Sequence, residues 1–143
     1  MIRQTLDVSG QAYVRVTGNS MWPMLRHLRD GVVISSREPV HVGDIVLFDR
    51  LDGHYALHRV IRKGRNGFTM AGDNQWHMEE ALAYDQIMGV VVRIDRKGHK
   101  ISRNNFFIKS YAITVTALTF LRIYLWKMVQ KLVKPFRDKQ PTG

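Results

Sequence analysis

The residue best suited to covalent chemistry is Ser20, which lies in the run from Gly18 to Leu25, GNSMWPML. A serine between a glycine turn and a proline that can open a short helix has a fixed, accessible hydroxyl. Such a hydroxyl can act as a nucleophile. The same residues also fit a capped turn with a purely structural role, because Asn and Ser are common turn residues.

A serine nucleophile needs a base within hydrogen-bond reach and donors for the developing oxyanion. Of the six histidines, His58 stands inside an apolar, strand-like run, YALHRVI, on the face opposite Leu57 and Arg59. A lone strand histidine can also be structural. The histidines show no metal-ligand spacing and the chain has no cysteine, so we expect neither a metal site nor a cofactor.

Four short motifs, in this order and spacing, resemble those of type I signal peptidases and their S24/S26 relatives. They are Ser20-Met21-Trp22-Pro23, Gly43-Asp44-Ile45-Val46, His58-Arg59-Val60-Ile61 and Gly72-Asp73-Asn74. The resemblance covers roughly residues 14–92 and leaves out the C-terminal segment.

The resemblance implies a serine endopeptidase with Ser20 as nucleophile. The bacterial branch has a lysine base immediately before Arg-Val-Ile, whereas this chain has His58 there, as in the endoplasmic-reticulum and archaeal-like branch. Asp73 is the expected acid beside His58. Met78-Glu79-Glu80 stands in place of a further acidic position of the family, with Glu79 as the nearest substitute. His54, four residues upstream on the same strand face, is a rival base.

The remaining motif residues are expected to support the site or to contact substrate. The Ser20 N–H is the expected oxyanion donor, and Gly18 stands where some bacterial members carry a second donor, a hydroxyl. The substrate-binding or site-supporting residues are Gly18, Met21, Pro23, Gly43, Asp44, Arg59, Gly72 and Asn74. Met21, Trp22 and Met24 fit either contact with substrate or bilayer or a place in the core.

The elements that must position these residues read as short strands between turns. β-like runs span 12–17, 32–36, 44–49, 55–63, 68–71 and 89–96, with turns at 30–31, 51–53, 64–67 and 97–98 and a helical turn within 79–86. We therefore expect a mainly β, signal-peptidase/S24-like domain of short, coiled antiparallel strands over residues 1–104. A long C-terminal α-helix and tail should follow over residues 105–143.

The C-terminal segment carries most of the net charge of +10. Residues 97–143 hold ten Lys/Arg against one acid, whereas residues 1–96 hold twelve against eleven. Basic and apolar side chains share this helix, and its longest uncharged stretch is Ser110–Leu121, short of the roughly twenty residues of a usual membrane span. We expect it to span or to lie on an anionic membrane. If it spans, the more basic tail prefers the cytoplasm and the catalytic domain faces the extracytoplasmic side.

These observations predict a membrane-associated serine endopeptidase that removes signal or leader peptides from exported precursors. The expected substrate is an extended peptide with small residues near the cleavage site. The alternatives are a leader peptidase for one dedicated, ribosomally made peptide, a self-cleaving S24-type regulator, and a non-catalytic interaction protein. No nucleic-acid partner is expected, because the basic excess sits in the terminal segment and the first ten residues leave no room for a helix-turn-helix.

Overall fold

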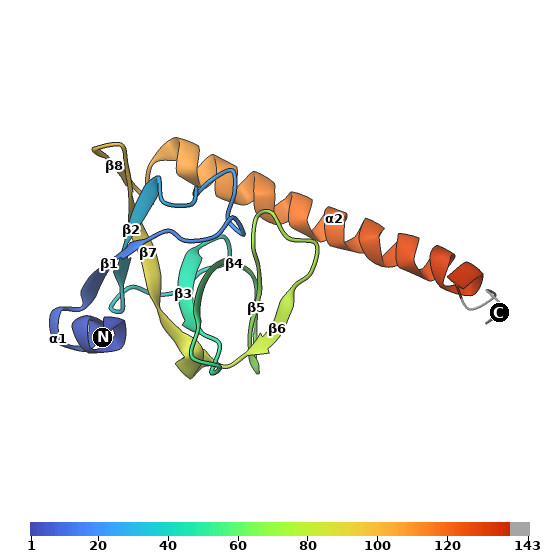
Figure 1. The fold of residues 1–143 in the computed structure, drawn as a ribbon, viewed down its shortest axis with the longest axis horizontal. Coiled ribbons are helices and arrows are strands. Elements are labelled where there is room, and N and C mark those ends of the chain that lie inside the picture. The colour runs from blue at the N-terminus through green and yellow to red at the C-terminus, as the bar shows by residue number, and fades with distance from the viewer. Residues whose placement is uncertain (138–143) are drawn as a thin grey trace.

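The computed structural model describes residues 1–137 and contains a β domain followed by one long helix (Figure 1). The elements are α1 (Ile2–Ser9), β1 (Gln11–Arg15), β2 (Asp30–Ser35), β3 (Ile45–Asp49), β4 (Tyr55–Gly64), β5 (Gly67–Ala71), β6 (Glu79–Leu82), the 3₁₀ turn η1 (Tyr84–Gln86), β7 (Ile87–Arg96), β8 (His99–Ser102) and α2 (Phe106–Arg137). The expected fold class, mainly β with a long C-terminal helix, is confirmed.

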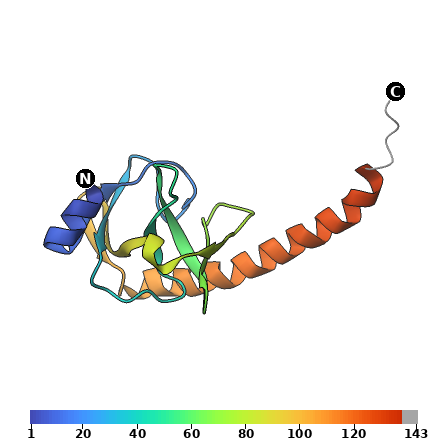
Figure 2. The ribbon, with the colours of Figure 1, turned by 90° about the horizontal axis from the view of Figure 1, so that it is seen from below.

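All eight strands belong to one antiparallel sheet in the order β1-β2-β7-β3-β4-β5-β6, with β8 paired to β7. The register shifts within four of these pairings. Such bulges bend strands and increase their twist. The sheet therefore coils upon itself (Figure 2).

Coiling buries both faces of the central strands. Along β3, Ile45 and Leu47 belong to one apolar cluster, whereas Val46 and Phe48 belong to a second. Alternate residues of a strand point to opposite faces, so β3 separates the two clusters. The site residues of β4, the neighbour of β3, are sorted between the same two faces.

The helix α2 begins where Asn105 caps it, since Asn105 Oδ1 accepts a hydrogen bond from the Phe107 N–H at 2.9 Å. Glycine and proline are absent from the following residues as far as Val133. The helix α2 packs along the β domain as far as about Trp126, and the rest of the helix projects beyond it (Figures 1 and 2). By length and composition, Phe106–Lys134 could cross a membrane.

Several local predictions need correction. The helical turn expected within residues 79–86 is present as the 3₁₀ turn η1, but Glu79–Leu82 form the strand β6, which was not predicted. Asp30 and Gly31 lie inside β2 and are not a turn, because the ring of Tyr13 packs over Gly31 and the β1–β2 pairing continues to it. The sequence reading missed α1 and β8, both short. The turns at 64–67 and 97–98 are confirmed as hairpin connections.

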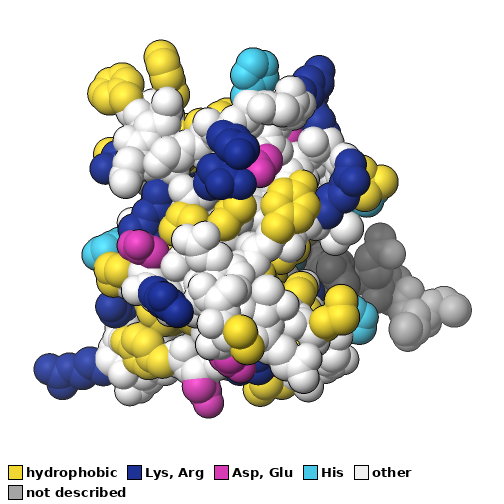
Figure 3. Space-filling model, turned by 90° about the vertical axis from the view of Figure 1, so that its left-hand side faces the viewer, with side chains coloured by type: hydrophobic (Ala, Val, Ile, Leu, Met, Phe, Trp, Pro, Cys, Tyr) yellow, Lys and Arg dark blue, Asp and Glu magenta, His cyan; other side chains and the backbone are white. Residues whose placement is uncertain are grey.

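The end of the molecule that carries α1 and β8 has no single charged field. Figure 3 shows basic and acidic side chains interspersed there with small apolar areas. This agrees with the near balance of charge in residues 1–96.

Candidate active site

Ser20 lies in the turn that follows β1 and is fastened from both sides. Its backbone oxygen accepts a hydrogen bond from the Asn74 N–H at 2.9 Å. The next residue, Met21, and Leu25 are buried in the first apolar cluster. Because Asn74 holds the Ser20 carbonyl and Met21 is buried, the Ser20 backbone has a fixed place beside the Gly72-Asp73-Asn74 segment.

Gly72 allows this close approach. A β-carbon at residue 72 would lie 2.5 Å from the Ser20 carbonyl oxygen, so only glycine fits. In the β4–β5 pairing Arg59 is opposite Ala71, and the next step of the same register sets His58 opposite Gly72. Opposed residues of an antiparallel pair point to the same face, with β-carbons about 5 Å apart. The Ser20 backbone thus covers the face of the sheet to which the His58 side chain belongs.

His58 is buried on the face of Phe48, whose ring centre lies 5.4 Å from the centre of the imidazole. Burial, together with the positive charges of Arg50 and His77, lowers the pKa of His58 from 6.5 to about 4. The imidazole is therefore neutral at pH 7, the form that can accept a proton.

The carboxylate next to His58 is that of Glu79 in β6. Its Oε1 lies 3.4 Å from His58 Nδ1, a buried nitrogen without a hydrogen-bond partner among the described residues. Glu79 also accepts a hydrogen bond from Arg50. A small approach of Glu79 would complete a hydrogen bond to Nδ1 and orient the ring.

Asp73 has a different partner. Both of its carboxylate oxygens accept hydrogen bonds from Arg59 at 2.7 Å, and both side chains are buried. Arg59 also donates to the Gly43 carbonyl at 2.7 Å. The expected contact of Asp73 with His58 is not present, because His58 and Arg59 point to opposite faces of β4. Asp73, Arg59 and Gly43 form a buried frame beneath the site.

Other predicted residues lie around this frame or away from it. Gly18 has a φ of 81°, and its N–H donates to His27 Nδ1 at 2.8 Å. Asp44 accepts a hydrogen bond from the His41 N–H at 2.9 Å, and Pro23 is exposed after a cis peptide bond. His54 is exposed beside Asp52 in the loop before β4, so its expected place on the strand face is wrong.

The motif methionines and tryptophan are divided between core and surface. Met21 and Met24 are buried in the first apolar cluster, whereas about half of Trp22 is exposed. The prediction of a place in the core is thus correct for both methionines.

Sequence reasoning missed a contribution from α2. Arg122 donates to the Asp73 carbonyl at 2.8 Å and the Gly72 carbonyl at 3.5 Å, and its guanidinium lies 5.4 Å from the ring centre of Trp76. The rings of Trp76 and Trp126 are 5.8 Å apart. An arginine near the middle of an apolar helix is the signal that could have indicated this role, because such a charge needs a partner.

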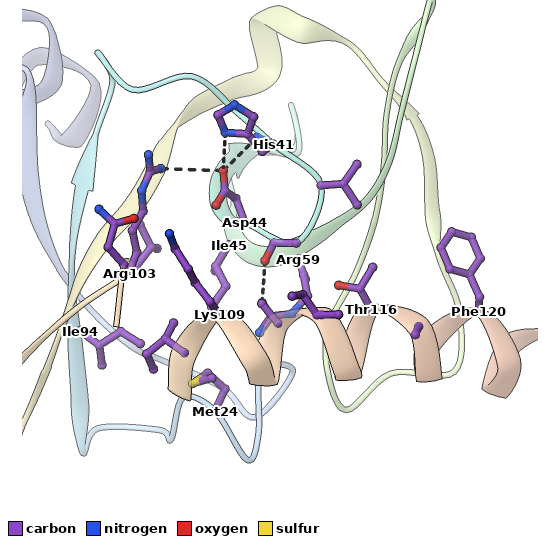
Figure 4. Close-up of a pocket in the computed structure, with 18 residues that line it drawn as sticks. Met24, His41, Asp44, Ile45, Arg59, Ile94, Arg103, Lys109, Thr116 and Phe120 are labelled. Carbon is purple, nitrogen blue, oxygen red and sulfur yellow. Dashed lines mark hydrogen bonds and ion pairs between the residues drawn. The ribbon is translucent and has the colours of Figure 1, made fainter. Parts of the chain in front are cut away.

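A cavity of about 650 Å³ lies between α2 and the sheet (Figure 4). Its walls include Ile45, Ile94, Ile108 and Thr116, and at one end His41 and Arg103 both interact with Asp44. Arg59 also lines it, so the cavity is on the side of β4 opposite His58. It is therefore separate from the candidate site.

The described residues contain no cluster of three or more His, Asp or Glu side chains suited to a metal ion. The site offers instead a hydroxyl, a neutral imidazole and a carboxylate from three separate segments. This combination suits acyl transfer through a serine nucleophile.

Comparison with known proteins agrees with this chemistry. A family model described as Peptidase S24-like matches residues 2–92, more than half of the chain. The match ends within β7 and leaves out β8 and α2. No curated protein matches the sequence.

Proposed function

Because the chain belongs to the Peptidase S24-like family, we propose that it is a serine endopeptidase with Ser20 as nucleophile and His58 as general base. The observation that carries this proposal is the close approach of the Ser20 carbonyl to Gly72, which lies one step beyond the Arg59–Ala71 pair and so on the side of His58. It supports a place for the Ser20 backbone near His58, a residue 38 positions away in the sequence.

In the proposed reaction, the His58 imidazole takes the proton of the Ser20 hydroxyl while Oγ attacks the scissile carbonyl. The imidazolium then gives this proton to the leaving amine, and an acyl-enzyme remains. Water, deprotonated by His58, attacks the ester, and proton return to Ser20 releases the second product. Since Glu79 lies beside Nδ1, Nε2 is the nitrogen we assign to proton transfer with Ser20.

Glu79 has the role that the sequence reading favoured for Asp73. Its negative charge would stabilise the imidazolium that forms in the transition state and select the tautomer with a proton on Nδ1. Arg50 holds Glu79 in place. Asp73 instead keeps Arg59 and the Gly72 turn in position.

We assign the substrate to signal or leader peptides of exported precursors, read as an extended strand with small residues near the cleaved bond. The resemblance of the four motifs to signal peptidases supports this class. A single dedicated peptide is a narrower version of the same proposal. Such substrates emerge on the extracytoplasmic side of the membrane, which is therefore the proposed location of the β domain.

Cleavage of a purified exported precursor by the full chain in detergent micelles tests the proposal. Ser20→Ala and His58→Gln should each reduce cleavage at least a thousandfold, and Ser20→Ala should also abolish labelling by a serine-acylating probe. Thr17→Ala and His54→Gln are matched controls, because both remove exposed groups near the same segments. Cleavage at the normal rate by folded Ser20→Ala would disprove the assignment.

Self-cleavage is the second candidate, because the family match extends to self-cleaving S24 regulators. Incubation of the full chain at increasing dilution separates the two. A self-cleaving protein loses intact mass at a rate independent of concentration and leaves added precursors uncut. The endopeptidase keeps its intact mass while it cuts precursors.

A further inference from the structure

The face of α2 that points away from the β domain is mainly apolar, with Ser110, Thr114 and Lys131 as polar positions. At about 100° per residue, nine side chains fall within an arc of roughly 140°. This outer stripe consists of Phe106, Phe107, Ile113, Leu118, Leu121, Tyr124, Leu125, Met128 and Leu132, each at least 44% exposed. Ile113, at the edge of the stripe, also lines the cavity between α2 and the sheet. Thr116, Thr119 and Ile123, on the opposite side, are buried against the domain.

The outer stripe extends over about 39 Å of helix. Soluble monomers rarely expose a continuous apolar area of more than a few hundred Å². We therefore expect another apolar surface to bury the outer stripe.

The charges beside the outer stripe indicate which surface buries it. Lys109, Lys127, Lys131 and Lys134 are exposed and follow one flank of the outer stripe. The helix contains no Asp or Glu between Phe106 and Arg137. An apolar stripe with a row of lysines along its edge fits the boundary between acyl chains and anionic lipid headgroups.

The contacts of α2 with the domain decide between spanning and lying flat. Arg122 and Trp126 still contact the loop that follows β5, through Asp73 and Trp76. Only eleven residues of the described helix follow Trp126, about 17 Å of length, against the roughly 30 Å of a bilayer's hydrocarbon core. Four of these eleven are Lys or Arg. The helix cannot cross the bilayer while the domain keeps this position.

We propose that α2 lies in the plane of an anionic bilayer surface, with the outer stripe in the acyl-chain boundary and the β domain above it. This goes beyond the proposed function and does not depend on peptidase activity. It has one consequence for the site: the Gly72–Asn74 turn contacts both Arg122 and Ser20, so Ser20 is held close to the membrane surface.

Depth measurements with single cysteines test this proposal, and the cysteine-free chain needs no background substitutions. Spin labels at residues 113, 121, 128 and 130 of the full chain are measured on phosphatidylglycerol-containing vesicles. A flat helix gives similar shallow depths at 113, 121 and 128 and a more water-accessible label at 130. If the label depth instead rises to a maximum along the helix, on every face of it, the helix spans the bilayer and the proposal is overturned.

Binding variants identify the partner. Leu125→Asp should weaken vesicle binding at least tenfold, whereas Gln130→Asp, with the same change of charge outside the stripe, should weaken it much less. Lys131→Gln should weaken binding about fivefold on vesicles with phosphatidylglycerol and little on pure phosphatidylcholine. Equal effects of Leu125→Asp and Gln130→Asp would disprove the proposal. So would a soluble dimer that Leu125→Asp dissociates and that binds no vesicles.

Discussion

His58 shows how one environment can prepare a base. Burial against Phe48 disfavours the imidazolium, and Arg50 and His77 add to this effect. A neutral imidazole can accept a proton directly. A lysine ammonium group must first lose a proton, which requires heavy desolvation at neutral pH. Glu79 then supplies the negative charge that the imidazolium requires during the reaction.

The lowered pKa of His58 predicts the pH dependence of the peptidase. Since the ring loses its proton at about pH 4, the rate of precursor cleavage should rise through pH 4 and stay level from pH 6 to 8. A pH profile of kcat/KM measures this. A limb centred near pH 6.5 would mean that the ring is hydrated in the working enzyme.

The same pKa predicts a change in stability. Between pH 6.5 and 4 the unfolded chain binds a proton at His58 that the folded chain does not, so the free energy of unfolding falls as the pH falls. The loss should approach about 3 kcal/mol at pH 4. Urea unfolding at pH 7 and pH 4.5 should show a smaller difference for His58→Gln. An equal difference in both proteins would assign the effect to other groups.

Glu79→Gln should lower kcat at least tenfold with little change in KM, because the glutamine keeps the shape and loses the charge beside His58. Glu80→Gln is the matched control, since Glu80 is exposed on the neighbouring position of β6. Steady-state kinetics on one peptide substrate measures both. Equal kcat values for the two variants would remove Glu79 from the mechanism.

At the scale of elements, the site depends on a buried frame. The Arg59–Asp73 pair joins β4 to the turn after β5, and Arg59 reaches the Gly43 carbonyl before β3. The Arg59 guanidinium thus connects three segments of the chain. The frame keeps Gly72 against Ser20 although none of its charges belongs to the proposed proton transfer.

Asp73→Ala should destabilise the fold by about 3–5 kcal/mol, because it leaves the Arg59 charge buried without a partner. The double variant Arg59→Met/Asp73→Leu should lose much less, since no unpaired charge remains. Asp95→Ala is the control, because its pair with Arg93 is on the surface and contributes little. Urea unfolding measures all three, and a double variant as unstable as Asp73→Ala would argue against the unpaired charge as the cause.

The docking of α2 is the second support of the site. Arg122→Ala removes two contacts to the carbonyls of Gly72 and Asp73 and should cost about 1–3 kcal/mol of stability. The looser turn should also lower kcat more than it changes KM. Arg122→Lys should restore part of both, and Lys127→Ala, an exposed change on the same helix, should affect neither. A wild-type kcat in Arg122→Ala would show that α2 serves only to attach the protein to the membrane and does not support the site.

At the scale of the whole molecule, a nearly neutral β domain is joined to a basic, apolar helix. The family match ends within β7, so α2 lies outside the matched residues. It packs on the domain with one face and leaves the outer stripe free. We infer that this helix determines where in the cell the peptidase meets its substrate.

The sequence by itself determined the elements whose signals are local. The β-like runs, the hairpin turns and the long helix follow from side-chain periodicity and turn residues, and four motifs identified Ser20 and His58 as candidates. It did not reveal the strand β6, because such a short polar run takes its structure from pairing with β5.

Only the tertiary structure decided which charges meet. Asp73 and Glu79 are both acids near the family's motif, and the alternation of side chains along β4 directs Arg59 to one and His58 to the other. The contacts of Arg122 with Asp73 and Gly72 join residues about fifty positions apart. No periodicity within either segment encodes such a contact, because it arises only when the helix packs on the coiled sheet.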